Sequence, residues 1–237
     1  YVTLEPCCHT GKQPPCTEAV LASGVKRVIV GCTDPNPVVA GRGIRLLREK
    51  GLEVVAGVLR GECERQNEVF FHFMRTKLPF TVLKYAMTLD GKTATVSGKS
   101  QWITGEAARN RVHEDRGRYM AILTGVSTVL ADNPQLTCRI PGGKNPIRVI
   151  ADTKLRTPLS STVVQTARET PTWIVTAVSD AGRKKAYEDA GCRVLSVPAK
   201  EGELDLQAMM QRLGEEKVDS VMVESGGTLA WSFLKAG

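Results

Sequence analysis

Short runs of β-branched and other apolar residues alternate along this chain with longer segments in which apolar residues recur every three to four positions. The short runs predict strands, and the longer segments predict helices. Their alternation is typical of β-α units that build a sheet covered by helices, so we expect an α/β protein. The expected strands are residues 2–4, 27–31, 53–58, 81–86, 121–124, 147–151, 172–176, 193–196 and 220–223. The expected helices are residues 17–23, 41–50, 62–75, 105–117, 180–190, 206–215 and 228–236.

A boundary between two domains is expected near residues 76–79. An expected helix rich in phenylalanine ends there, and Pro79 starts a new strand. We therefore expect one domain over residues 1–76 and a second over residues 79–237. The sequence opens inside an expected strand without a methionine and closes where a helix ends, so we expect it to be part of a longer protein.

Composition limits the class of protein. The chain has 237 residues, of which 42% are hydrophobic and 24% charged, enough for one large domain or two small ones. No apolar run is long enough to cross a bilayer, and seven scattered cysteines indicate reduced thiols, so we expect a soluble cytoplasmic protein. The net charge of +7 is compatible with a nucleic acid or with an anionic small molecule. The basic residues are interspersed with acidic ones, which favours the small molecule.

The strongest chemical signal is the segment PCCHTGKQPPC, residues 6–16. It places Cys7 and Cys16 at the two ends of a short loop rich in glycine and proline. Thiolates are good zinc ligands, and a catalytic zinc ion takes three protein ligands and one water, so this pair would supply two of the three. The alternative is that cysteines serve as small buried apolar side chains, which we expect for Cys63, Cys138 and Cys192. For His72 and His113, each on an expected helix, we expect packing or surface roles.

A second signal lies near the carboxyl end of the chain, where Glu224-Ser-Gly-Gly-Thr228 joins an apolar strand to the last helix. Paired glycines at a helix N-terminus let backbone N–H groups approach a phosphate, and the helix dipole favours the anion. Glycines also make tight connections, so the junction alone is a weak indication. It differs from the G-x-G-x-x-G dinucleotide fingerprint, and we do not expect a Rossmann domain.

These motifs carry a family resemblance. Residues 1–16, with Asp34-Pro-Asn-Pro37 and Ala40-Gly-Arg-Gly43, resemble the deaminase half of the bifunctional deaminase/reductases of riboflavin biosynthesis. Four further segments of this chain resemble the reductase half of these enzymes. They are LKYAMTLDGK at 83–92, SQWIT at 100–104, TVLADN at 128–133 and VESGGT at 223–228. The resemblance covers nearly the whole chain in the family's order. It implies part of a cytidine-deaminase-like domain followed by a dihydrofolate-reductase-like domain, in a homo-oligomer.

The resemblance implies two reactions on one phosphorylated ribosylaminopyrimidine. The first is zinc-dependent deamination of 2,5-diamino-6-ribosylamino-4(3H)-pyrimidinone 5′-phosphate, for which zinc would make hydroxide available at neutral pH. The second is NADPH-dependent reduction of the ribosyl group to a ribityl chain. In this family the third zinc ligand and the catalytic glutamate precede the position of Tyr1. Glu5 is expected to be structural, and the deaminase is expected to be incomplete in this chain.

The resemblance also implies roles for individual residues. For the deaminase, Cys7 and Cys16 would hold zinc, and the substrate contacts would be His9, Lys12, Asp34 and Asn36. Asp34-Pro-Asn-Pro37 is also an ordinary turn sequence, and a simple turn is its alternative interpretation. For the reductase, the catalytic residues would be Lys84 and Glu224, and the other substrate contacts Ser100, Arg116, Leu136 and Arg139. The NADPH contacts would be Ala86, Trp102, Thr128, Asp132, Gly226, Gly227 and Thr228.

Two other functions remain open at this point. One is a stand-alone dihydrofolate-reductase-like enzyme that reduces a pteridine or pyrimidine and keeps the zinc loop only as structure. The other is a nucleic-acid-binding zinc module. The interspersed charge, the aromatic content of 5% and the lack of a second metal-ligand pair argue against the nucleic-acid module. The expected partner is therefore a phosphorylated small molecule, with neither nucleic acid nor membrane.

Overall fold

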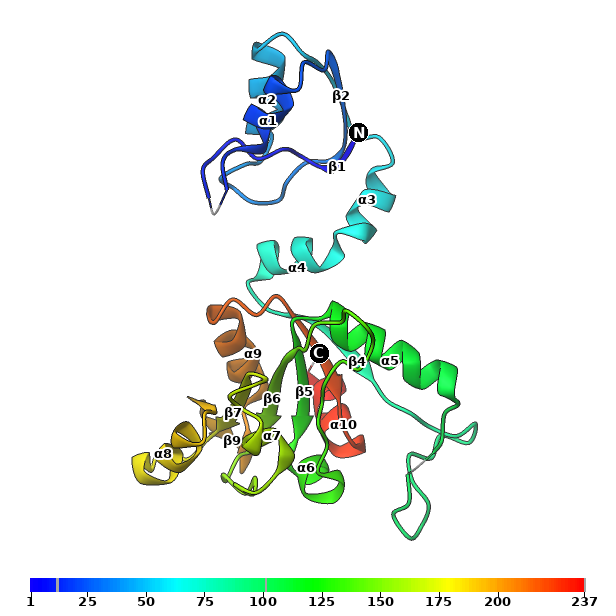
Figure 1. Cartoon of the computed structure of the whole chain (residues 1–237), viewed down its shortest axis with the longest axis vertical. Helices are drawn as coiled ribbons and strands as arrows, with labels where there is room; N and C mark the ends of the chain where they lie inside the picture. The colour runs from blue at the N-terminus through cyan, green and yellow to red at the C-terminus, as the bar shows by residue number, and fades with distance from the viewer. Residues whose placement is uncertain (12, 101, 237) are drawn as a thin grey trace. The chain divides into compact units, whose positions relative to one another are not determined.

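The structure is a computed structural model that describes residues 1–11, 13–100 and 102–236. The chain divides into two compact units, Tyr1–Lys77 and Leu78–Gly237 (Figure 1).

The first unit contains a parallel sheet of three strands in the order β1-β2-β3. These strands are β1 (Val2–Leu4), β2 (Arg27–Cys32) and β3 (Glu53–Ala56). Helices α1 (Cys16–Ala22) and α2 (Arg42–Glu49) connect them, and α3 (Arg60–Gln66) and α4 (Glu68–Thr76) follow β3.

The alternation of side chains along β2 gives this small sheet two apolar faces. Val28 and Val30 pack with Ile44 and Leu47 of α2, and with partly buried residues of α1. On the opposite face, an added Cβ on Gly31 would overlap Cys63 of α3, and Cys32 at the end of the strand packs with Cys63 and with Phe71 of α4. Helices α1 and α2 therefore cover one face of β2, and α3 packs against the other.

The second unit is built on six parallel strands in the order β4-β11-β5-β6-β7-β8. The strands are β4 (Phe80–Lys84), β5 (Ala121–Gly125), β6 (Ile147–Ala151), β7 (Thr172–Thr176), β8 (Arg193–Ser196) and β11 (Ser220–Glu224). The helices are α5 (Glu106–Arg118), α6 (Val126–Asp132), α7 (Thr162–Gln165), α8 (Ala181–Asp189), α9 (Leu206–Glu215) and α10 (Gly227–Ala236). Strands β9 (Ala199–Lys200) and β10 (Glu203–Leu204) form a separate antiparallel pair.

Two layers of helices enclose the six-stranded sheet. Leu123, Val149 and Val223 point to one face, where they pack with Met209 and Leu213 of α9 and with partly buried residues of α10. Right-handed crossovers in the order β4, β5, β6, β7, β8 place α5 to α8 on the opposite face. Neighbouring residues in β11 alternate between the faces, so Glu224 lies on the α5 side of the sheet.

The structure confirms the α/β class and the parallel sheets, and it differs from the sequence-based expectation in several elements. The expected helix 62–75 is two helices, because the backbone departs from helical geometry at Asn67 (φ −106°, ψ 20°), whose side chain donates to the Cys63 carbonyl at 2.7 Å. Helices α6 and α7 were not predicted, nor were the two-residue strands β9 and β10. The expected strand 81–86 ends at Lys84, which leaves Ala86 in the following loop.

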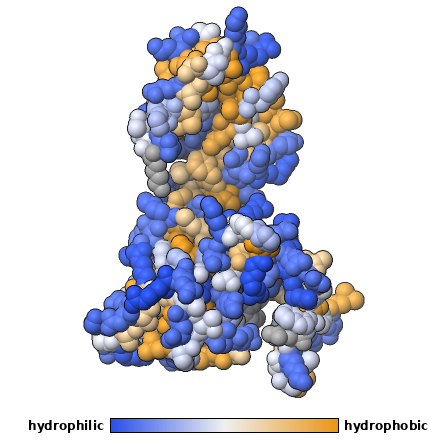
Figure 2. All heavy atoms as spheres, viewed as in Figure 1, coloured by the Kyte–Doolittle hydropathy of each residue, from blue (hydrophilic) through white to orange (hydrophobic). Residues whose placement is uncertain are grey.

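The surface agrees with the composition. Figure 2 shows mostly hydrophilic residues, with scattered hydrophobic ones, on the visible face of the second unit. Among the described residues, no helix has the length and apolar content that a membrane span requires.

Candidate functional site

The second unit has a cavity of about 790 Å³. Its walls come from the ends of β4 and β11, from the segment that leads to α5, from α5 and α6, and from the start of α10. The carboxyl ends of neighbouring parallel strands meet here, which is the usual position of ligand sites in open α/β sheets.

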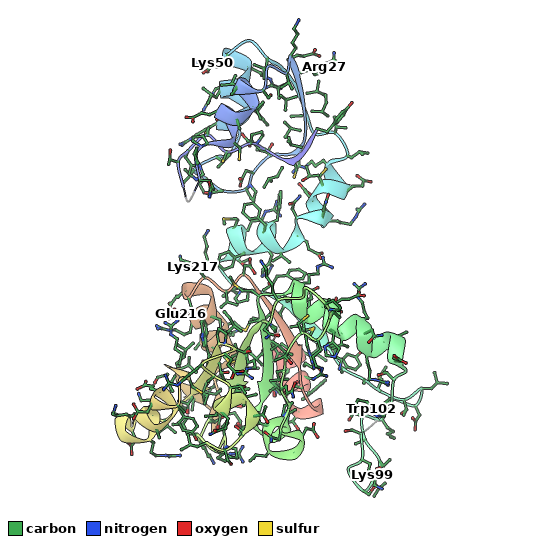
Figure 3. All side chains as sticks on the ribbon, viewed as in Figure 1. Arg27, Lys50, Lys99, Trp102, Glu216 and Lys217 are labelled. Atoms are coloured by element: carbon green, nitrogen blue, oxygen red, sulfur yellow. The ribbon has the colours of Figure 1, made fainter. Side chains whose placement is uncertain are left out.

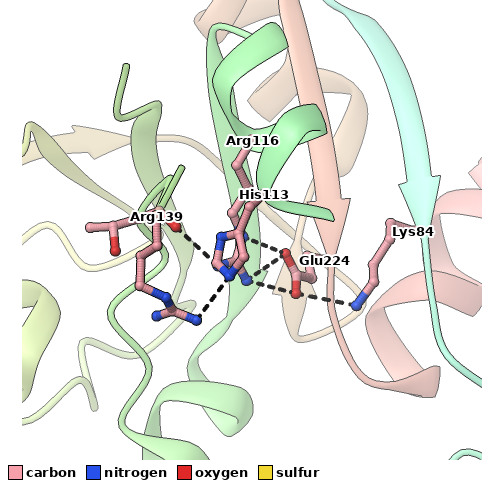
Figure 4. Close-up of polar contacts among 6 residues, drawn as sticks. Lys84, His113, Arg116, Arg139 and Glu224 are labelled. Atoms are coloured by element: carbon pink, nitrogen blue, oxygen red, sulfur yellow. Dashed lines mark hydrogen bonds and ion pairs between the residues drawn. The ribbon is translucent and has the colours of Figure 1, made fainter. Parts of the chain in front are cut away.

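Lys84 and Glu224 lie side by side in this cavity because of strand register. They are the last residues of β4 and β11 and are directly paired in the sheet. Lys84 Nζ lies 3.2 Å from Glu224 Oε1, although 140 positions separate the two residues in sequence. Figure 4 shows the two side chains converging from adjacent strands.

Arg116 holds the Glu224 carboxylate from the other side. Its Nη2 lies 2.9 Å and 3.0 Å from the two carboxylate oxygens, and its Nε donates at 3.1 Å. Nη1 donates to the Thr137 carbonyl at 3.1 Å. Arg116 is buried, and a buried guanidinium needs partners of this kind to offset its lost hydration. The result is a fixed carboxylate between two cations, with Lys84 on the more exposed side.

His113 and Arg139 extend this cluster. His113 lies one helical turn before Arg116 on α5, and its Nε2 is 3.1 Å from Nη2 of Arg139. Burial lowers the pKa of His113, and the neighbouring Arg116 and Arg139 cations lower it further. Sequence reasoning assigned His113 to packing or the surface. The i, i+3 spacing to Arg116, which puts both side chains on one face of a helix, was the signal that could have placed it here.

The start of α10 provides a site for an anion. Added Cβ atoms on Gly226 and Gly227 would meet nothing within 4 Å, so both glycines border open space in the cavity wall. The adjacent Ser225 Oγ is buried and has no hydrogen-bond partner among the described residues. Free backbone N–H groups at a helix N-terminus and an unsatisfied hydroxyl fit the phosphate groups of the dinucleotide that the resemblance implies.

Trp102 lies on the segment between β4 and α5, which extends away from the sheet (Figure 3). The guanidinium carbon of Arg109 is 4.6 Å from the centre of the Trp102 ring, and Arg109 also donates to the Thr104 carbonyl at 2.6 Å. The stacking gives an exposed aromatic side chain a defined position beside the cavity. Arg109 was not a sequence candidate, and we know of no pattern in the chain that would have selected it.

The structure brings most of the reductase candidates together. The predicted residues that line the cavity are Lys84, Ala86, Ser100, Trp102, Arg116, Thr128, Asp132, Arg139, Glu224, Gly226 and Gly227. Two others are not among the lining residues. Leu136 is buried with a left-handed backbone (φ 55°), and Thr228 lies in the first turn of α10, where its carbonyl accepts from Ser232.

The first unit places Cys7 and Cys16 next to each other. The Cys16 backbone N–H donates to Cys7 Sγ at 3.3 Å. The hydrogen bond with Cys7 and then burial raise the pKa of the Cys16 thiol. Within the described residues, no group of three or more histidine, cysteine, aspartate or glutamate side chains is arranged to hold a metal ion. The donor set therefore fits two positions of a zinc shell, and no chemical step can be assigned to zinc from these residues.

The other deaminase candidates are held by backbone contacts. Glu5 accepts from the N–H groups of Asp34, Gly41 and Ile44 at 2.9 to 3.1 Å, which explains a structural role for this carboxylate. Asp34 accepts from the Asn36 N–H at 2.8 Å, a local turn contact that does not decide between a substrate contact and a simple turn. Burial raises the pKa of Asp34.

His9 and Lys12 complete the deaminase candidates. His9 Nδ1 is buried without a partner among the described residues. The His9 side chain lies close enough to Asp34 to lower the pKa of that carboxyl and offset part of the effect of burial. Lys12, the remaining candidate, lies outside the described residues.

Comparison with known proteins gives a consistent result. The sequence profile of the RibD C-terminal domain matches residues 79–237. The riboflavin biosynthesis protein RibD of Actinobacillus pleuropneumoniae is 50% identical over 237 residues, which are 100% of this chain and 63% of the relative. RibD of Escherichia coli (strain K12) is 40% identical, with 100% of this chain and 66% of the relative covered. The chain thus spans less than two thirds of the length of these relatives.

Comparison with solved structures gives the same result as the comparison of sequences. A diaminohydroxyphosphoribosylaminopyrimidine deaminase/5-amino-6-(5-phosphoribosylamino)uracil reductase from Thermotoga maritima is similar with a TM-score of 0.83 and 39% identity, over 100% of this chain and 64% of that one. RibD of Acinetobacter baumannii is similar with a TM-score of 0.85 and 36% identity, over 99% and 64% of the two chains.

Proposed function

The chain belongs to the RibD C-terminal domain family, and from this premise we propose that its second unit is an NADPH-dependent reductase of riboflavin biosynthesis. The proposed substrate is 5-amino-6-(5-phosphoribosylamino)uracil, the compound named for the Thermotoga maritima relative. Its ribosyl group would be reduced to a ribityl chain. We also propose that the division at Lys77 and Leu78 separates this dihydrofolate-reductase-like domain from a part of a cytidine-deaminase-like domain.

One observation carries the proposal, namely the Lys84–Glu224–Arg116 cluster in the cavity wall. Reduction of a cyclic ribosylamine requires its ring to open: the bond between the first carbon and the ring oxygen breaks, the ring oxygen gains a proton, and the nitrogen on the first carbon loses its proton as a C=N bond forms. Lys84 offers an ammonium donor for the ring oxygen, and Glu224 offers a carboxylate acceptor for the proton of that nitrogen. Arg116 keeps the carboxylate oriented, so the geometry is ready before substrate arrives.

The fit of the cofactor rests on the start of α10. When bound, NADPH would supply the hydride that the first carbon of the sugar receives. Gly226, Gly227 and the Ser225 hydroxyl would hold its phosphate groups, and Trp102 would pack against it from the loop before α5. Ala86, Thr128 and Asp132 are proposed as further cofactor contacts, and their positions in the cavity wall support this.

The substrate phosphate is assigned to Arg139. The guanidinium of Arg116 is already committed to Glu224 and Thr137, whereas the Arg139 side chain is exposed and lines the cavity. A guanidinium binds phosphate through paired N–H donors. Both arginines were expected to contact the substrate, and we propose that Arg139, not Arg116, contacts its phosphate.

For the first unit we propose a deaminase-related role in which Cys7 and Cys16 are two zinc ligands and His9, Asp34 and Asn36 face a pyrimidine. Support comes from the proximity of the two thiols and of His9 to Asp34. Two ligands give a weak site, so we expect zinc to be lost on dialysis. One tightly held zinc ion per chain in elemental analysis would contradict this expectation.

The reductase proposal is tested by NADPH oxidation with purified protein. We expect turnover of the phosphoribosylaminouracil, and we expect Lys84→Ala and Glu224→Gln each to lower kcat at least about 100-fold, the usual contribution of a group that assists proton transfer. The matched control is Cys7→Ser, in the first unit, which should leave kcat within about twofold of wild type. Turnover of dihydrofolate alone would favour the stand-alone pteridine reductase, and equal losses in all three variants would refute the separation into two sites.

A further inference from the structure

His113 is the one histidine that lines the cavity within the described residues, and the reductase roles proposed above leave it without a task. It lies on α5 and shares a face of that helix with Arg116, while Arg139 comes from the loop between α6 and β6. Figure 4 shows the His113 ring between the Arg139 side chain and the Arg116–Glu224 pair.

The contact between His113 and Arg139 determines which protonation state and tautomer of the imidazole fit the geometry. A guanidinium nitrogen can only donate, so Nε2 of His113, 3.1 Å from Arg139 Nη2, must accept. An accepting Nε2 has no proton, and the ring is then neutral with its proton on Nδ1, which is buried and has no hydrogen-bond partner among the described residues. The hydrogen-bond network thus assigns the tautomer.

The charges that face the ring come from every element around it. Arg116 on α5 and Arg139 on the loop before β6 are positive, and Glu224 at the end of β11 is negative. Glu224 is shared between Arg116 and Lys84, so it offsets only part of their positive charge, and the surroundings of the ring are net positive. A positive charge on His113 would also remove the acceptor of the Arg139 hydrogen bond and repel the guanidinium.

We propose that neutral His113 is a positioning residue that holds Arg139 in the cavity wall for the phosphate of a sugar-phosphate ligand, and that protonation of His113 releases Arg139. The inference deepens the proposed function, because that function identifies the ligand as a phosphoribosyl compound. It adds a residue and a pH response that the cluster of Lys84, Arg116 and Glu224 does not itself require.

Binding of ribose 5-phosphate, measured by calorimetry at pH 7.5 and pH 5.5, tests the proposal without turnover. At pH 7.5 we expect His113→Phe to bind about tenfold more weakly than wild type, the effect of losing one hydrogen bond to a charged group. His113→Gln, whose amide oxygen can still accept, should bind within about threefold of wild type. The matched control is His72→Gln on α4, which makes the same replacement outside the cavity. This variant should bind ribose 5-phosphate as wild type does.

The change in ribose 5-phosphate affinity on acidification distinguishes a positioning role of His113 from direct contact between His113 and the phosphate. The phosphate of the ligand itself gains a proton near pH 6, and this loss of charge affects every variant equally. We expect wild type to weaken more than His113→Gln between the two pH values. If wild type instead tightens relative to His113→Gln, the charged imidazole contacts the phosphate directly, and the proposal is wrong.

A double-mutant cycle makes the test independent of folding losses. In an Arg139→Gln background, His113→Phe should have no further effect on ribose 5-phosphate binding, because the residue that it positions is gone. An additional loss of the full size would overturn the proposal. In kinetics, His113→Phe should raise KM and leave kcat within about twofold.

The outcomes distinguish this inference from the proposed function. If the pH and variant pattern of ribose 5-phosphate binding appears but the protein does not oxidise NADPH with any ribosylaminopyrimidine, the reductase assignment fails and the positioning role stands. If the protein is an active reductase and all His113 variants bind ribose 5-phosphate alike, only the positioning role fails.

Discussion

At the scale of single residues, the largest polar side chain in the core is that of Arg148 on β6, which is 1% exposed. All three of its guanidinium nitrogens donate to neutral oxygens at 2.8 to 3.1 Å. The acceptors are the Thr172 and Thr166 hydroxyls and the carbonyls of Gln135, Val163, Thr166 and Thr170. Burial lowers the pKa of Arg148 to about 10, so the side chain remains charged at neutral pH. It connects β6, β7 and the segment around α7.

Arg148→Met should destabilise the second unit by about 3 kcal/mol or more, because several buried acceptors would lose their donor together. Arg148→Lys should recover little of this loss, since one ammonium cannot reach acceptors spread around a planar guanidinium. Urea denaturation measures both. The control Arg111→Met removes exposed ion pairs on α5 and should change the free energy of unfolding by less than about 1 kcal/mol. A comparable loss in the control would contradict the explanation.

Cys192 gives a prediction about alkaline pH. Burial raises the pKa of this thiol to about 11, against a nearby Arg148 charge that acts in the opposite direction. A thiol with a raised pKa in the folded state favours folding below its unfolded pKa of 9.0, and this contribution is lost as pH rises toward 11. Between pH 8 and pH 10 we expect the wild type to lose about 1 kcal/mol more stability than Cys192→Ala. Equal losses in urea denaturation would refute the raised pKa.

The site was predictable from sequence to the extent that residue types and motif order determine it. The positions of Lys84, Glu224, Gly226 and Gly227 at the ends of expected strands could be predicted from local pattern, whereas their roles came from the family resemblance and stay predictions. The pairing of Arg116 with Glu224 was not identified, since 108 positions separate them and only the fold brings them together. His113 was missed for the same reason, because its partner Arg139 lies on a loop with no regular pattern.

At the scale of elements, α2 shows how a strand end organises a helix. The Glu5 carboxylate follows β1 and accepts the N–H groups of Gly41 and Ile44, so it caps the positive end of the helix. Gly43, in the first turn of α2, packs so closely on this segment that an added Cβ would overlap the Pro6 carbonyl oxygen.

Gly43→Ala should therefore destabilise the first unit by about 1 to 3 kcal/mol, as expected for overpacking against backbone. The control is Gly61→Ala in α3, where the nearest neighbour of an added Cβ is the flexible end of Arg65 at 3.7 Å. The control should leave the unit equally stable or more stable by up to about 1 kcal/mol, because alanine is the better helix former. Thermal unfolding followed by circular dichroism compares the two. Destabilisation by both variants alike would mean that the close approach to Pro6 is not the cause.

The elements that sequence reasoning missed are those with weak local signals. Helix α6 contains Val126, Thr128 and Val129, which are β-branched and favour strands when considered alone. Helix α7 spans four residues, and β9 and β10 span two each, so none of them is long enough to show a repeating pattern of apolar residues. The long strands and helices, by contrast, were placed within a few residues of their observed bounds.

At the scale of the whole molecule, the chain consists of two units with separate cores, Tyr1–Lys77 and Leu78–Gly237. All described residues that line the 790 Å³ cavity belong to the second. The cysteine pair and the Asp34 turn belong to the first. The proposed reductase and the proposed deaminase-related site can therefore be tested by substitutions in one unit at a time.

The pairing of β4 with β11 has a kinetic consequence. The first and last long strands of the second unit are neighbours, so β4 and β11 can pair only after the chain between them, about 140 residues, has formed a loop. Contacts so distant in sequence form late, because the chain entropy is lost before the contacts compensate for it. During synthesis, the contact between Lys84 and Glu224 can form only after Glu224 has left the ribosome. In refolding from urea we expect enzymatic activity to return with the slowest phase, after most of the far-ultraviolet signal, so that catalysis itself reports completion of the fold.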